Sequence, residues 1–320
     1  MIGNRVKKIV GFVLVLSFAL SSTACVDLSA IQKFTESASD VGKRFPNLAK
    51  DLSASCKRQH VYQALRKAQF RPERLVKITH PDKGSEDEAA LNSACKGFSE
   101  QEQRLIEANA VLIGYLKTMG DLAADDLTAH DKELDGLGKS FTNGNIFNDP
   151  EVTAVKGLVG FLLKAATEGY RRKQLKKALE EQNDNIQLVT AGLRRIVAER
   201  YVQQLENERD QLRSYYGSSI SDYNVYMAKV AQNAGAKPGD MVQDPLPIIQ
   251  VKRLWDDEEN TLAARIEAAN AYAKALDNIA QGHQKLYDSR NDLSSKTVLA
   301  TALAYGKTIQ SLVEDFRKAF

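Results

Sequence analysis

Apolar residues recur at seven-residue intervals along much of this chain, and this spacing limits the fold more than any other feature. Residues seven apart lie on one face of an α-helix, so two neighbouring rows form a seam that packs against other helices. One pair of rows consists of Leu105, Leu112 and Met119 and of Ala108, Tyr115 and Leu122. Alternating patterns typical of β-strands are scarce. The sequence therefore predicts an all-α protein, an elongated antiparallel helical bundle or coiled-coil hairpin of four to five helices.

The spacing changes in the second half of the chain. A later row, made of Leu179, Ile186 and Leu193, keeps the seven-residue interval. The next apolar residues then fall four apart, at Val197, Tyr201 and Leu205. Because a four-residue stutter locally unwinds a supercoil, we expect the regular packing to be interrupted here.

Proline and glycine residues divide the chain into segments. Pro46 should kink or divide the first helix, and Asp149 followed by Pro150 is typical of a helix start, with Asp149 as the cap. The clearest linker is 233–247, which contains Gly235, Pro238, Gly239, Pro245 and Pro247. We therefore expect a signal peptide over 1–24, an N-terminal helical region over 25–148 and a long helical hairpin over 149–320.

The first 24 residues have the layout of a secretory signal peptide. Arg5, Lys7 and Lys8 form a positively charged start, an uncharged apolar run covers 9–20, and small residues cover 21–24. A permanent membrane span needs about 20 apolar residues, so the run is too short for one. An uncleaved short anchor and ordinary cleavage to a soluble periplasmic protein are the alternatives.

The small residues lead directly into Cys25. This segment resembles the bacterial lipoprotein signal, in which the cysteine becomes the first mature residue and carries acyl chains. Ser22 stands where that family usually has Leu, and Val26 stands where Asp usually signals retention in the inner membrane. The resemblance covers only this segment. It implies lipidation at Cys25 and a location at the outer membrane, facing the periplasm.

The charge balance argues against a nucleic-acid partner. The chain has 44 Lys and Arg and 41 Asp and Glu, and the signal segment holds three basic residues and no acidic one. The remainder is therefore formally neutral and has no overall positive field to collect nucleic acid.

Two cysteines remain after Cys25, namely Cys56 and Cys95. An even pair in an exported protein predicts a disulfide bond; two free buried thiols are the alternative. His60 lies four residues after Cys56, which is a helical ligand spacing, but no CxxC or HxxxH motif supports a metal site. We expect neither a metal nor a cofactor.

Two clusters are candidates for contacts with other molecules. Tyr215, Tyr216, Tyr223 and Tyr226 gather near the expected tip of the hairpin, where they form either an interaction surface or packing between helices. The apolar stretch 152–166 is followed by basic residues and could lie on an anionic membrane through Leu158, Phe161 and Leu162. A buried helix is the simpler interpretation of this stretch.

No catalytic pattern is present in the sequence. There is no GxSxG, no HExxH and no glycine-rich phosphate loop. The tetrapeptide HPDK at 80–83 resembles the loop of J-domain co-chaperones but follows no long basic helix, so we interpret it as a turn. The sequence thus favours a non-enzymatic envelope lipoprotein that acts as a helical interaction scaffold or spacer. Its expected partners are the membrane, an envelope protein and, in a homo-oligomer, further copies of itself. The alternative is a membrane-active helical protein that inserts through 152–166.

Overall fold

The structure is a computed structural model that describes residues 28–68, 86–125, 141–142, 146–168, 172–233, 235, 246–317 and 319. Within these residues every regular element is a helix, so the all-α prediction is confirmed. The α-helices are α2 (Ser29–Ala68), α4 (Glu86–Ala94), α5 (Lys96–Ala124), α7 (Asp149–Glu168), α8 (Leu175–Arg195), α9 (Val202–Asn233), α10 (Leu246–Asp288) and α11 (Lys296–Arg317). Cys25, the signal segment and the HPDK tetrapeptide lie outside the described residues.

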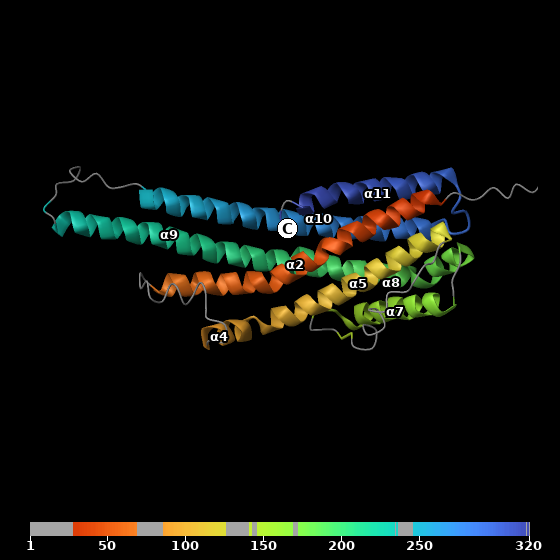
Figure 1. The fold of residues 1–320 in the computed structure, drawn as a ribbon, viewed down its shortest axis with the longest axis horizontal. Helices are drawn as coiled ribbons and strands as arrows, with labels where there is room; N and C mark the ends of the chain where they lie inside the picture. The colour runs from red at the N-terminus through yellow and green to blue at the C-terminus, as the bar shows by residue number, and fades with distance from the viewer. Residues whose placement is uncertain are drawn as a thin grey trace, which may run out of the picture.

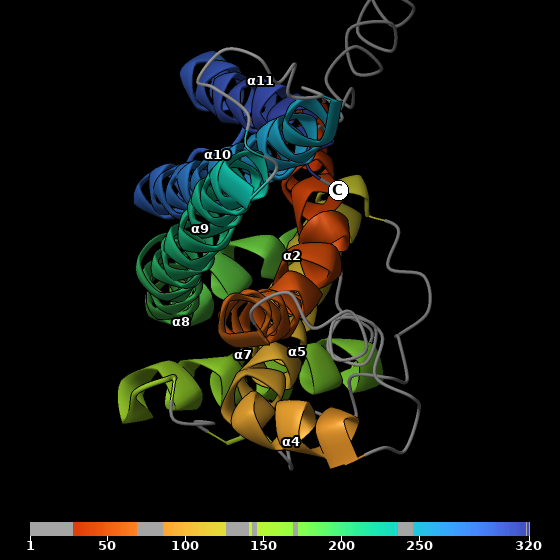
Figure 2. The ribbon, with the colours of Figure 1, turned by 90° about the vertical axis from the view of Figure 1, so that its left-hand side faces the viewer.

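The helices run along one long axis (Figure 1). In the end view, α11 lies on one side of the molecule and α4 and α7 on the opposite side, with α2, α8 and α9 between them (Figure 2). Helix α2 packs against α5, α9 and α11. The start of α2 and the far end of α9 lie at opposite ends of the long axis (Figure 1).

The described helices outnumber the four to five that the sequence predicts. Between Glu86 and Ala124 the chain forms two helices, α4 and α5, which meet at Cys95. The segment after the linker divides into α10 and α11 at a turn, where Asp292 N–H donates to the Ser289 carbonyl at 2.8 Å. This turn follows Asp288 and is rich in Ser, Asn and Asp, whose short polar side chains favour turns over helix. These turn-forming residues are visible in the sequence, but the helical pattern on both sides makes the turn easy to miss.

The stutter predicted after Leu193 coincides with an irregular helical segment. Residues Ile196–Tyr201 form a π-helical segment, η2, which joins α8 to α9 in one continuous rod. A wider turn accommodates residues spaced four apart on one face. Leu193, Val197, Tyr201 and Leu205 are accordingly all fully buried.

Pro46 lies inside α2 and does not end it. A proline has no N–H to donate to the carbonyl four residues earlier, which here belongs to Gly42. The buried Asn109 of α5 donates its amide Nδ2 to that carbonyl at 2.9 Å, and its Oδ1 accepts from the Tyr272 hydroxyl at 2.7 Å. One side chain thus satisfies the group that Pro46 leaves free and links α2, α5 and α10. Helix α2 continues through the proline and bends along its length (Figure 1).

Helix α7 begins with a reciprocal cap one residue earlier than the sequence predicts. Asn148, not Asp149, supplies the capping oxygen: its Oδ1 accepts from Glu151 N–H at 2.9 Å. Glu151 Oε2 accepts in return from Asn148 N–H at 2.8 Å, which completes a capping box. Arg195 of α8 also donates to Glu151 Oε2 at 2.8 Å, so the same carboxylate ties α7 to α8.

Candidate interaction arm and its buried base

The hairpin of α9 and α10 ends in a segment without a fully buried residue, in which only Tyr215, Tyr216 and Trp255 pack against the core. Helix α9 has no buried residue after Leu212. In α10, no residue from Pro247 to Thr261 is buried, and Leu262, the next residue, is fully buried. We call residues 213–233 and 247–261 the arm. Figure 1 shows α9 extending past the other helices at this end of the molecule.

Large apolar side chains are exposed on the arm. Among the described residues five such side chains are exposed, and four of them belong to the arm: Val225, Tyr226, Ile249 and Leu254. The fifth, Leu188, lies on α8. Tyr226 is 62% exposed and Leu254 is 56% exposed. Exposed apolar residues gathered in one place are typical of an interaction site, whereas scattered ones need no explanation.

The structure separates the four predicted tyrosines into two groups. Tyr215 and Tyr216 pack at the base of the arm, with their ring centroids 5.0 Å apart. Tyr215 also contacts Tyr62 of α2, and Tyr216 stacks on Trp255 of α10. Burial and the nearby Glu258 carboxylate raise the pKa of Tyr216 to about 12. These two tyrosines serve packing between helices.

Tyr223 and Tyr226 lie further out on the arm. Tyr223 is half-buried, whereas Tyr226 is exposed. Sequence reasoning missed the other exposed residues, Val225, Ile249 and Leu254. Apolar residues at helical spacing look the same in the sequence whether another helix packs against them or not. Their exposure is therefore apparent only in the structure.

A buried polar cluster joins α2 to the rod below the arm. Arg58 lies between two carboxylates: its Nη1 donates to Asp51 Oδ1 at 2.9 Å and its Nη2 to Glu208 Oε2 at 3.0 Å. Tyr201, from the π-helical segment, donates its hydroxyl to Asp51 Oδ2 at 2.7 Å. Ser55 donates to Glu208 Oε2 at 2.6 Å.

Charges within this cluster are balanced. Arg265 of α10 approaches Asp51 at 3.6 Å, so two arginines face two carboxylates. Burial alone would lower the pKa of Arg58, but hydrogen bonds and charges of Glu208 and Asp51 raise it overall. Both carboxylates accept hydrogen bonds from side chains of the cluster. The cluster positions α9 and α10 on α2. In the sequence, the one sign of this cluster is the position of Glu208. It lies three residues after Leu205 and so falls on the same helix face as the apolar row.

The predicted disulfide is present. Cys56 of α2 and Cys95 are bonded with an S–S distance of 2.07 Å and lie 5.9 Å apart at Cα. The bond fixes the junction of α4 and α5 to α2. The ligand atoms of Cys56, Cys95 and His60 lie within 4.8 Å of one another. A metal binds thiolates, and here both sulfurs are used in the disulfide.

The apolar stretch considered for membrane contact lies in the core. Leu158, Phe161 and Leu162 are all buried, and the rings of Phe161 and Tyr115 pack edge to face with their centroids 5.6 Å apart. Contact between these side chains and a bilayer would require α7 to separate from α5 and α8. Among the described helices, none has the length and apolar character needed to cross a membrane.

A second buried polar chain surrounds His283, which is fully buried. Tyr115 lies 2.7 Å from Nε2 and Asn183 Oδ1 lies 3.0 Å from Nδ1. The amide oxygen can only accept, so Nδ1 carries the proton and Nε2 accepts from the tyrosine hydroxyl. Burial lowers the pKa of His283 to about 3, which keeps the ring neutral. Because a substrate cannot reach this ring, its role is structural.

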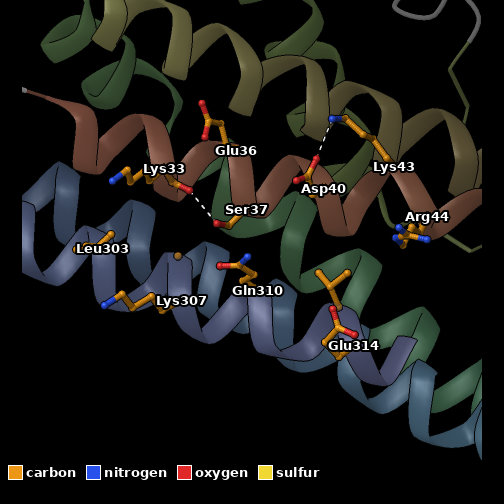
Figure 3. Close-up of a pocket in the computed structure, with 12 residues that line it drawn as sticks. Lys33, Glu36, Ser37, Asp40, Lys43, Arg44, Leu303, Lys307, Gln310 and Glu314 are labelled. Atoms are coloured by element: carbon orange, nitrogen blue, oxygen red, sulfur yellow. Dashed lines mark hydrogen bonds and ion pairs between the residues drawn. The ribbon is translucent and has the colours of Figure 1, made fainter. Parts of the chain in front are cut away.

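A groove of about 560 Å³ lies between α2 and α11. Lys33 and Asp40 come from one wall and Lys307 and Gln310 from the other (Figure 3). Asp40 is paired with Lys43 at 2.8 Å. Gly306 allows the two helices to approach here, since a Cβ at this position would lie 3.2 Å from the Phe34 Cα. The groove mixes both signs of charge and does not select a class of ligand.

No known protein family, curated protein or solved structure matches this chain.

Proposed function

We propose that this protein is a lipid-anchored envelope protein that acts as a non-enzymatic helical scaffold and presents the arm to a protein partner. The proposal is supported by the positions of the start of α2, which is close to Cys25, and of the arm. Helix α2 begins at Ser29, four residues after Cys25, and its start lies at the opposite end of the molecule from the arm (Figure 1). A lipid at Cys25 would therefore hold the membrane at one end and leave the arm free at the other.

The contacts at the base of the arm support a presenting role. The cluster around Arg58 fixes α9 and α10 to α2 just below the arm. Tyr215 of the arm contacts Tyr62 of α2, and the stacking of Tyr216 on Trp255 joins the two arm helices to each other. The exposed apolar residues beyond that base are thus held in a defined orientation. A prealigned surface binds at a lower entropic cost than a flexible one.

The alternative function, insertion through 152–166, receives no such support. Its three candidate side chains are core residues of α7. The separation of α7 that insertion requires would expose them and also break the Glu151–Arg195 ion pair, 2.8 Å long.

Capture from envelope extracts tests the role of the arm. We expect the full chain to recover a protein partner reproducibly, and the double variant Tyr226→Ser, Leu254→Ser to lose it. Leu188→Ser is the matched control, because Leu188 is an exposed apolar residue outside the arm. Equal recovery by the arm variant, or no reproducible partner for the wild-type chain, would refute this role.

Mass spectrometry of the mature N-terminus tests the anchor. We expect an acylated Cys25 as the first residue and release of a Cys25→Ala variant from the membrane fraction. More than one acyl chain is needed for stable anchoring, so the acylation state is part of the readout. An unacylated wild-type protein would contradict the proposal.

A further inference from the structure

His60 lies beside the disulfide and has no partner of its own among the described residues. It follows Cys56 by four residues on α2, so the two side chains lie on the same face of the helix. Both residues just before it are engaged: Arg58 bonds to the buried carboxylates, and Gln59 accepts from Gln204 Nε2 at 2.9 Å. No hydrogen bond, ion pair or ring contact with a described residue uses the imidazole of His60.

The disulfide and this imidazole together have the composition of a zinc site. Zn²⁺ is bound by cysteine thiolates and histidine nitrogens, with four ligands in a tetrahedral arrangement. In such a site neighbouring ligand atoms lie about 3.6–3.8 Å apart. The sulfurs of Cys56 and Cys95 and the ring nitrogen of His60 lie within 4.8 Å of one another. A shift of about 1 Å by side-chain rotation therefore brings the nitrogen within reach of a metal held by the two sulfurs.

The three ligands leave one coordination position toward solvent. Cys56 and Cys95 are buried, whereas His60 is partly exposed. Among the described residues no further histidine, aspartate or glutamate joins the group. Water is thus the fourth ligand, as in other zinc sites with three protein ligands. Ca²⁺ and Mg²⁺ prefer oxygen ligands, so two sulfurs and one nitrogen select Zn²⁺ over them.

We propose that Cys56, Cys95 and His60 form a Zn²⁺ site when the disulfide is reduced. A dithiol reductant transfers two electrons and two protons to the S–S bond and leaves as its own disulfide, which frees two thiols. Zn²⁺ then displaces the two thiol protons, because it binds the thiolates. The ion holds the junction of α4 and α5 to α2 in place of the covalent bond. The inference goes beyond the proposed function and depends neither on the arm nor on Cys25.

Co²⁺ serves as a coloured substitute for Zn²⁺ in the test. The full chain is purified in detergent, reduced with a phosphine and freed of excess reductant in the absence of air. We expect the reduced chain to bind one Co²⁺ with the visible and near-ultraviolet absorption of a tetrahedral thiolate complex. Zn²⁺ should displace the Co²⁺, since it binds such ligands more tightly. The oxidised chain should show no such absorption, because its sulfurs are not thiolates.

Variants on α2 test each ligand. His60→Ala should weaken Co²⁺ binding by at least about tenfold, since even the groups behind metal ligands contribute that much. His60→Cys supplies another ligand and should restore the affinity. Cys56→Ser should abolish the thiolate absorption. Lys67→Ala is the control, because Lys67 is exposed on the same helix and lies outside the group, and its affinity should equal that of the wild-type chain.

Urea unfolding supplies a second measurement. Zn²⁺ should raise the urea midpoint of the reduced wild-type chain and leave that of reduced His60→Ala nearly unchanged, because an ion that binds the folded state stabilises it. A reduced wild-type chain that unfolds without metal should regain its helical circular dichroism on addition of Zn²⁺. The inference is wrong if the reduced wild-type chain binds no Co²⁺, if its complex lacks thiolate absorption, or if His60→Ala keeps wild-type affinity. Each of these results leaves the role of the arm untouched.

Discussion

Asn109 carries out at the scale of one residue a task that normally belongs to the backbone. Its amide replaces the donor that Pro46 lacks and so lets a 40-residue helix continue through a proline. The proline predicted a kink or a break, and the side chain that prevents the break lies 63 positions further along, on α5. Local sequence could not reveal it, because the pairing depends on how α2 and α5 pack.

We predict that Asn109→Ala lowers the free energy of unfolding by about 1–3 kcal/mol, since the buried Gly42 carbonyl then has no donor. In a Pro46→Ala background the backbone N–H restored at this position can reach that carbonyl, so the cost of Asn109→Ala should fall by about 1 kcal/mol. Urea unfolding of the four chains gives this double-mutant cycle. Asn278→Ala is the control, because Asn278 makes a similar bond at an exposed site. If the changes in unfolding free energy of the two single variants simply add in the double variant, Asn109 does not compensate for the proline.

His283 makes stability depend on pH. Its pKa is about 3 in the fold, because of burial, and about 6.5 in an unfolded chain. Between these values the unfolded state binds the additional proton, so stability is complete above pH 6.5 and is lost as the pH falls toward 3. At pH 5 the loss is about 2 kcal/mol relative to about pH 7.5.

The test compares the wild-type chain with His283→Gln, which cannot titrate. The difference in unfolding free energy between about pH 7.5 and about pH 5 should be smaller in the variant by about 2 kcal/mol. Carboxylates contribute to the pH dependence of both chains and cancel in the comparison. An unchanged difference would mean that the ring is protonated in the fold.

At the scale of helices, the disulfide is the covalent link between α2 and the α4–α5 junction. It closes a loop with a sequence separation of 39. We predict that a Cys56→Ser, Cys95→Ser variant loses about 3–4 kcal/mol on the chain-entropy estimate. In urea unfolding the wild-type chain should lose stability on addition of dithiothreitol, whereas the variant should not respond. A wild-type chain that is indifferent to reductant would argue that the bond contributes nothing.

The all-helical fold could be predicted from the sequence because it depends on the local spacing of apolar residues. The disulfide could be predicted because two cysteines remain after Cys25. The stutter at Val197 and Tyr201 was visible in the same way and coincides with the π-helical segment. The bonds of Arg58 to Glu208 and of Tyr201 to Asp51 could not be predicted, since each joins residues 150 positions apart. The turn after Asp288 was readable and was missed because the alanine-rich pattern continues on both sides of it.

At the scale of the molecule, the arm should be separable from the body. We predict that replacing 218–253 with a Gly-Ser linker of about four residues leaves the urea midpoint nearly unchanged, because no described residue of this segment is buried. A deeper replacement, 205–262, removes Leu205, Glu208 and Leu262 from the core and should destabilise the fold strongly. A large loss in the first variant would show that the arm supports the body.

The position of the first residues of α2, far from the tip of α9, has a geometric consequence if lipid is attached through Cys25. The long axis of the molecule then determines how far the exposed apolar residues of α9 stand from the bilayer. A shorter α9–α10 hairpin would reduce that distance and leave the attachment unchanged.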